Sequence, residues 1–134
     1  MLTNPYIIAI AIPLILILSG GFAKKLVRGS SFQWKDFYLG VEMTLATLGA
    51  SLTNFFDLRK LDQNGHANID PANITKNATF LAVSFFSLLI IMTVHQEWES
   101  RNQAPQKQLF WLGIFANLIG AGLMIAFTLF VKGV

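Results

Sequence analysis

Four long runs of apolar residues follow one another along the chain, at 5–22, 37–56, 78–94 and 109–131. A helix needs roughly 20 predominantly apolar residues to cross a bilayer. With their flanking residues, the runs predict spans at about 5–27, 36–63, 71–100 and 105–132. Because the connections are short, the pattern predicts an all-α integral membrane protein whose four transmembrane helices form an up-down-up-down bundle.

The connection between the second and third runs contains clear stop and start signals. Asn64-Gly65 is typical of a turn that ends a helix. Asp70 followed by Pro71 is typical of an N-cap and the first helical residue. A helix over 71–100 would be roughly 45 Å long at 1.5 Å per residue, longer than a hydrocarbon core of about 30 Å. We therefore expect helices 2 and 3 to form a long hairpin that protrudes on the outer side of the membrane.

The second span is less uniformly apolar than the others. On a helix that turns about 100° per residue, its large apolar residues fall on one side. An acidic and small-residue side lies opposite, and a stripe of small, hydroxyl and amide residues lies between them. The three groups are Val41, Leu45, Leu48, Leu52 and Phe55; Glu42, Ala46, Gly49, Ala50, Thr53 and Asp57; and Gly40, Thr44, Thr47, Ser51 and Asn54.

Glu42 has two interpretations of equal weight. A carboxylate inside a span is costly, by roughly 2.5–3.5 kcal/mol at the centre and less near the edge, so it needs a partner or water. It could line an ion path or relay protons. It could equally be a structural acid that is protonated, paired with Lys35 or another basic residue of the inner loop, or hydrogen-bonded to a neighbouring helix.

The hydroxyl stripe also has two interpretations. Hydroxyls and an amide at these intervals could line a narrow wet pore. Small residues at the same intervals favour close helix packing, and for the stripe alone we favour packing. The predicted pore-lining or ion-binding residues are Glu42, Thr44, Thr47, Ser51, Asn54 and Asp57. The predicted interhelical packing residues are Gly40, Gly49, Gly113, Asn117 and Gly120.

Composition narrows the class of protein. Hydrophobic residues make up 54% of the 134 residues and charged residues only 13%, against about a quarter charged in soluble domains. Little chain lies outside the spans, so we expect one domain over 1–134. The chain has no cysteine, and it shows no nucleophile–base pair, zinc-binding spacing or phosphate-binding glycine loop. We therefore predict no enzymatic activity, no metal site, no cofactor and no nucleic-acid partner.

Basic residues predict the orientation. Lys24, Lys25, Arg28 and Lys35 form the densest cluster, and the positive-inside rule places such a loop in the cytoplasm. Loops 24–35 and 100–107 are then cytoplasmic, and both termini lie outside. We expect a multi-pass protein of the plasma (inner) membrane.

These observations lead to one main functional hypothesis and two alternatives. The main one is a homo-oligomer that forms an ion-conducting channel or pore lined by helix 2, either as a housekeeping channel or as a membrane-disrupting effector. The first alternative is a non-conducting accessory or assembly subunit that binds another membrane protein. The second is a minimal proton-coupled transporter. The lipid bilayer is a partner in all three.

Overall fold

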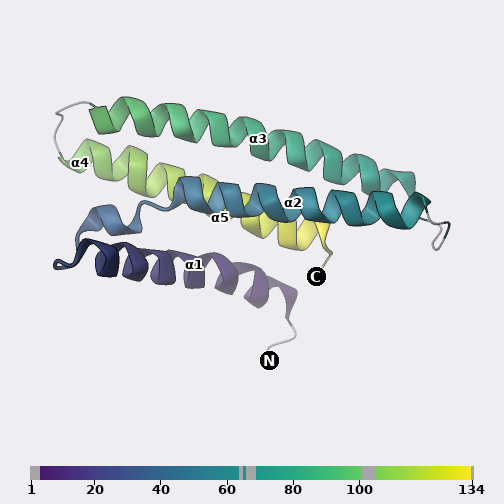
Figure 1. Ribbon diagram of the computed structural model, residues 1–134, viewed down its shortest axis with the longest axis horizontal. Helices are drawn as coiled ribbons and strands as arrows, with labels where there is room; N and C mark the ends of the chain where they lie inside the picture. The colour runs from purple at the N-terminus through teal and green to yellow at the C-terminus, as the bar shows by residue number, and fades with distance from the viewer. Residues whose placement is uncertain (1–3, 64, 66–68, 101–104, 134) are drawn as a thin grey trace.

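The described residues of the computed structural model are 4–63, 65, 69–100 and 105–133, and they contain helices but no strand. The first three long helices are α1 (Pro5–Arg28), α2 (Gly40–Gln63) and α3 (Pro71–Ser100), with a short 3-10 turn, η1 (Trp34–Phe37), before α2. The last helix runs from Pro105 to Val131 as α4 (Pro105–Gln108), η2 (Leu109–Phe115), α5 (Ala116–Ala126) and η3 (Phe127–Val131). The backbone stays right-handed helical at each junction, and η2 and η3 are π-helical. The all-helical prediction with four long helices is confirmed (Figure 1).

Three of the helices, Pro5–Arg28, Pro71–Trp98 and Gln106–Val131, are long and apolar enough to cross a membrane, which is consistent with a membrane protein. The helix α2 is 24 residues long, the same length as α1. It is not among the three, because hydroxyl, amide and acidic residues replace apolar ones along much of its length.

Local side-chain caps and glycines set where the helices begin and end. Asn4 caps α1 by accepting a hydrogen bond from the Tyr6 amide at 3.0 Å. Gly29, at φ 69°, ends the helix in the left-handed conformation that glycine adopts without strain. Asp70 caps α3 through the Ala72 amide at 3.0 Å, so the predicted start at Pro71 is confirmed.

The start of α2 differs from the prediction of a helix from 36. Residues 34–37 form η1, and α2 begins at Gly40. Asp36 accepts the backbone amide of Gln33 at 2.9 Å as the third residue of η1, in a capping box that begins this separate short turn. The backbone between η1 and α2 is bonded instead to Asn117 of the last helix, through the Phe37 carbonyl and the Leu39 amide. Tyr38 then adopts a non-helical conformation, at φ −80° and ψ 84°.

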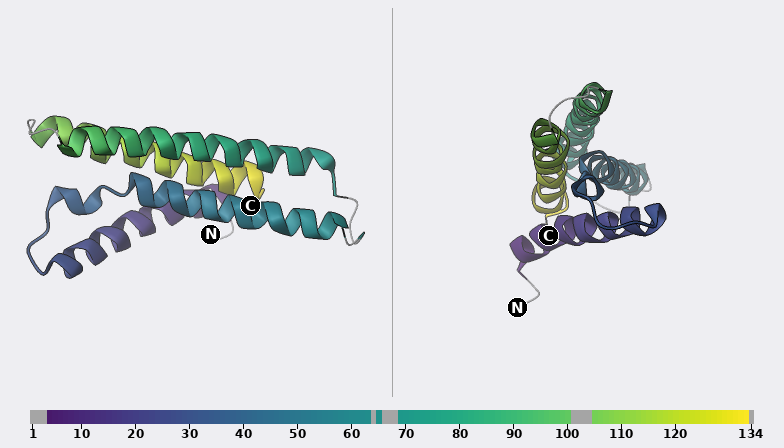
Figure 2. Two further views of the ribbon diagram at one scale, coloured as in Figure 1. Left: turned by 45° about the horizontal axis from the view of Figure 1, so that its top comes forward. Right: turned by 90° about the vertical axis from the view of Figure 1, so that its left-hand side faces the viewer.

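The helix α2 lies at the centre of the bundle, packed against α3 and α5. These helices run roughly along one axis, whereas α1 is inclined to them (Figure 2). The helix α1 contacts η1, α5 and η3. We call the end of the bundle with Lys24, Lys25, Arg28 and Lys35 the basic end, and the end where α2 meets α3 the hairpin end. At the hairpin end, α2 and α3 extend beyond the C-terminal helix (Figure 1).

Candidate functional site

The hydroxyl stripe of α2 faces the interior of the protomer. Thr44, Thr47 and Ser51 are at most 1% exposed, and Gly40 and Asn54 are also buried. The Thr44 hydroxyl donates to the Gly40 carbonyl at 2.7 Å, and the Thr47 hydroxyl donates to the Met43 carbonyl at 2.9 Å. Both hydroxyls are thus satisfied within α2, and the stripe is covered by neighbouring helices.

Ser51 makes the polar contact between α2 and α3. Its hydroxyl donates to the Asn77 side-chain oxygen at 2.9 Å, and the Asn77 amide donates back to the Ser51 carbonyl at 3.2 Å. Asn77 is fully buried. Asn77 is not among the residues predicted from the sequence to pack between helices. Its position directly before the apolar run that begins at 78 is the signal that could have indicated such a contact.

Glycines allow α2 and α5 to approach closely. A Cβ on Gly40 would lie 2.4 Å from the Ala116 carbonyl carbon, and one on Gly120 would lie 2.9 Å from the Gly40 carbonyl oxygen. Gly113 likewise receives the ring of Tyr38, at 2.8 Å from the Cβ position. Gly49 differs from these three, because it has nothing within 4 Å of its Cβ position. It faces outward and packs against no other helix of the protomer.

Asn117 supports the non-helical backbone that precedes α2. Its amide nitrogen donates to the Phe37 carbonyl at 2.6 Å, and its oxygen accepts the Leu39 amide at 2.9 Å. Irregular backbone is tolerated at membrane depth only where such partners exist. Asn117 therefore connects the last helix to the backbone just before α2. Both of its hydrogen-bond partners are backbone groups.

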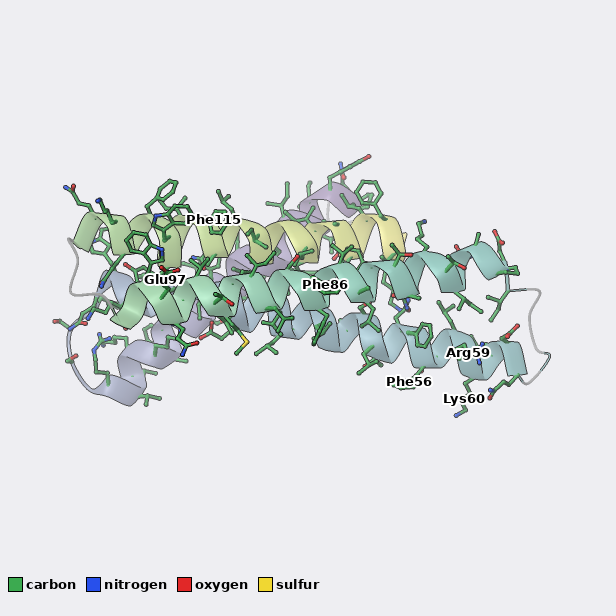
Figure 3. All side chains as sticks on the ribbon, turned by 90° about the horizontal axis from the view of Figure 1, so that it is seen from above. Phe56, Arg59, Lys60, Phe86, Glu97 and Phe115 are labelled. Carbon is green, nitrogen blue, oxygen red and sulfur yellow. The ribbon has the colours of Figure 1, made fainter. Side chains whose placement is uncertain are left out.

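The acidic and small-residue side of α2 points away from α3 (Figure 3), and its first residues, Glu42 and Ala46, face a cavity beside α1. All six of its residues are exposed, and we call them the outward row. They are Glu42, Ala46, Gly49, Ala50, Thr53 and Asp57. Phe56 and Lys60, on the same half of the helix, also point away from α3 (Figure 3). The outward row thus exposes two acids and a threonine among small residues, on a helix packed beside more apolar helices.

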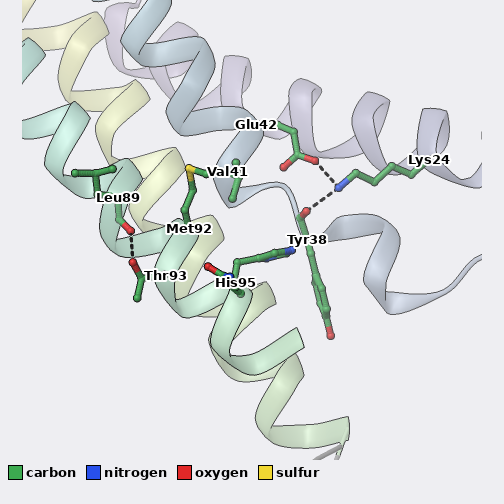
Figure 4. Close-up of a pocket in the computed structure, with 9 residues that line it drawn as sticks. Lys24, Tyr38, Val41, Glu42, Leu89, Met92, Thr93 and His95 are labelled. Carbon is green, nitrogen blue, oxygen red and sulfur yellow. Dashed lines mark hydrogen bonds and ion pairs between the residues drawn. The ribbon is translucent and has the colours of Figure 1, made fainter. Parts of the chain in front are cut away.

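Glu42 is paired with a lysine of α1. The Lys24 ammonium lies 2.5 Å from a Glu42 carboxylate oxygen and donates to the Tyr38 carbonyl at 2.8 Å (Figure 4). The partner is thus another basic residue of the predicted inner loop and not Lys35. The two side chains are 38% and 48% exposed, so the charges compensate each other but are not fully covered by protein.

Two cavities flank this ion pair. One, of about 600 Å³, lies towards α3 and is lined by Met92, Thr93 and His95 as well as by the pair itself. In Figure 4 the His95 side chain reaches across it towards the Tyr38 backbone. The other, of about 310 Å³, lies between α1 and α2 and is lined largely by small and apolar side chains, including Gly20 and Ala46. The pair is therefore accessible from both sides of α2.

A second ion pair fixes the connection between α1 and α2. Arg28 binds both carboxylate oxygens of Asp36, one of them at 2.8 Å, and also donates to the Ser31 carbonyl at 2.6 Å. Asp36 is only 2% exposed. The Arg28 guanidinium, helped by the Gln33 amide, lowers the pKa of Asp36 to about 2. Asp36 is therefore ionised, and committed to Arg28, at neutral pH.

Among the described residues, no group of three histidine, cysteine, aspartate or glutamate side chains is placed to hold a metal ion. Comparisons of the chain with protein-family models, with curated proteins and with solved structures found no match. The functional argument therefore depends on the geometry of α2 and its surroundings.

Proposed function

We propose that the protein is the protomer of a homo-oligomeric membrane pore, in which the outward row of α2 faces an ion-conducting lumen. One observation carries the proposal. The outward row is exposed and places Glu42, Thr53 and Asp57 among small residues, although α2 lies among three helices with the length and apolar character of membrane spans. A polar surface of this kind needs water or protein beside it in a bilayer.

A ring of copies would supply both. Cyclic assembly brings the same side of each protomer towards one axis, and the outward rows would then surround the axis. Ala46, Gly49 and Ala50 are small, so they leave room for a lumen between neighbouring copies of α2. The polar groups along that lumen would be Glu42, Thr53 and Asp57.

This arrangement assigns the hydroxyl stripe to a structural role. Thr44, Thr47 and Ser51 are buried inside the protomer, so the lumen of the proposed pore does not include them. Asn54, also buried, belongs with the same group. The stripe holds α2 against α3 and α5 so that the outward row is presented on one side.

The charges along the row suggest a preference for cations. Glu42 is neutralised by Lys24 at the basic end. Asp57 lies on the row near the hairpin end and is exposed, so a ring of Asp57 carboxylates would attract cations there. The exposed Lys60, one turn further towards the hairpin end on the same half of α2 (Figure 3), opposes this attraction and limits the expected preference. Asp62 is also exposed on α2, beyond Asp57, and on a helical projection it falls on another side.

These two aspartates provide a matched test in planar bilayers. The purified protein is expected to be a discrete homo-oligomer in mild detergent and to conduct ions after reconstitution. Asp57→Asn is expected to reduce the cation-to-anion permeability ratio measured from the reversal potential in a salt gradient, whereas Asp62→Asn removes the same charge and is expected to leave it unchanged. Equal ratios for Asp57→Asn and the unaltered protein would argue against a lumen along the row.

One observation favours a second candidate function, a minimal proton-coupled transporter. Lys24, Glu42 and His95 border the same cavity, and groups of this kind can exchange protons. The transporter predicts a dimer with pH-driven flux.

A monomer that binds a second membrane protein and conducts nothing would instead support an accessory subunit.

A further inference from the structure

A third cavity lies at the basic end, apart from the outward row. Its volume is about 560 Å³. One wall is the connection between α1 and α2, with Phe32, Trp34 and Lys35, and the other is the start of the last helix, with Gln106 and Gln108. Tyr38 lines both this cavity and the one beside Glu42, so the two cavities are neighbours.

Both walls of the cavity are fixed by contacts that their residues and neighbours make to other parts of the protomer. Asp36 is fixed by Arg28, and this pair holds the connection that carries the first wall. The ring of Phe32 stacks on that of Phe37, with centroids 6.2 Å apart and planes at 13°. Gln108 donates to the Trp98 carbonyl at 3.2 Å, which ties the second wall to α3. The site is therefore largely preformed, and a ligand would bind to walls that are already in place.

The polar lining is suited to an anion with several oxygen atoms. Lys35 contributes a cation, and glutamine amides contribute donors and acceptors. None of the described residues that line the cavity carries a carboxylate. Asp36, the nearest acid in sequence, is turned to Arg28 and so does not oppose an anion there.

The apolar part of the lining indicates where that anion comes from. Trp34 is 75% exposed and Phe32 is 52% exposed, beside the ends of two helices apolar enough to cross a membrane. Aromatic rings at this position are typical of the level of the lipid headgroups. A cation and amides beside exposed rings match a lipid, which presents a charged headgroup next to acyl chains.

We propose that this cavity binds the headgroup of an anionic phospholipid in the leaflet at the basic end, with its phosphate on Lys35 and its hydroxyl groups on the glutamine amides. Phosphatidylglycerol has this chemistry. The proposal goes beyond the pore and stands independently of it, because no residue of the outward row lines this cavity.

Native mass spectrometry can test the site by counting lipids retained on the protein during titration with phosphatidylglycerol or phosphatidylcholine. The unaltered protein is expected to retain phosphatidylglycerol more tightly. Lys35→Gln is expected to weaken that binding by about tenfold, the loss expected for one charge-assisted hydrogen bond. Lys35 is exposed, so the substitution leaves the packing of the bundle intact.

Lys107→Gln is the matched control. Lys107 lies between two lining residues in sequence and is exposed, but it does not line the cavity. Its substitution removes the same charge from the same end of the bundle and is expected to leave lipid retention unchanged. Equal losses in both variants would show diffuse attraction and overturn the site. Equal retention of both lipids, or displacement of the lipid by an equal concentration of inorganic phosphate, would also overturn it.

Discussion

The two sides of α2 have similar residues but opposite environments. The hydroxyl stripe, with Gly40, Thr44 and Ser51, is buried against α3 and α5. The outward row, with Gly49 and Thr53, is exposed. Each side contains glycine and hydroxyl residues that suit close helix packing. Residue type therefore does not decide which side is covered. Position relative to the neighbouring helices does.

The space around two glycines of α2 measures this difference. A Cβ on Gly40 would lie 2.4 Å from the Ala116 backbone, whereas one on Gly49 would have no neighbour within 4 Å. Within one helix, the same residue type thus serves a contact in one place and leaves an open surface in the other. The proposed assembly gives that open surface a use.

Alanine substitutions at these two glycines should produce the largest contrast. Gly40→Ala is expected to destabilise the protomer by about 3 kcal/mol, at the upper end of overpacking costs, because the Ala116 backbone cannot move aside easily. Gly49→Ala is expected to stabilise it by up to about 1 kcal/mol through helix propensity. Unfolding in a detergent–denaturant titration, followed by circular dichroism, measures both. Similar values for the two variants would mean that Gly40 is not at a close approach.

Alanine substitutions at two buried serines should give a smaller difference in the free energy of unfolding. Ser51 exchanges two hydrogen bonds with Asn77, so Ser51→Ala is expected to destabilise the protomer by about 1 kcal/mol. The Ser84 hydroxyl is buried without a hydrogen-bond partner in the described part of the chain. Ser84→Ala is therefore expected to be neutral or to stabilise the protomer by up to about 1 kcal/mol. The same unfolding titration applies, and a loss at Ser84 as large as that at Ser51 would contradict this account.

The smallest effect at neutral pH concerns the support for the start of α2. The pKa of Asp36 is about 2 in the folded protein, below the value of about 3.9 for a free aspartate. Its contribution to stability is thus complete above about pH 4 and is lost as the pH falls towards 2. Unfolding titrations between pH 5 and 2 should show this loss, and Asp36→Asn should reduce the slope in that window. An unchanged slope in the variant would place the acid sensitivity elsewhere.

Helix ends could be predicted from the sequence because their signals are local. Asp70 and Pro71 determine the start of α3 through contacts within a few residues. The start of α2 is harder to predict, since it depends on Asn117, which lies 78 positions from Leu39 in the chain. The length of the apolar run and its flanking residues extends the predicted helix back to 36. It contains no information about the hydrogen bonds from Asn117.

The placement of the polar groups could be predicted only in part. A helical projection separates the stripe from the outward row correctly, because their relative angles follow from the helix itself. It does not give the rotation of α2 against its neighbours, so both groups remain candidates for a pore. The partner of Glu42 also depends on tertiary structure. Lys24, Lys25 and Lys35 are the same residue type in the same predicted loop, so the sequence does not distinguish them, and Lys24 is the one that pairs with the carboxylate.

Cysteine accessibility along α2 tests the central claim most directly. The chain has no cysteine, so single substitutions at three consecutive residues sample three sides of the helix. Ser51 is buried, Leu52 is exposed on the apolar side, and Thr53 is exposed on the outward row. The proposed pore predicts that a charged, water-soluble thiol reagent reduces the current of Thr53→Cys and leaves Leu52→Cys and Ser51→Cys unaffected. Block of Ser51→Cys with no block of Thr53→Cys would contradict the proposal and place the conducting path along the hydroxyl stripe.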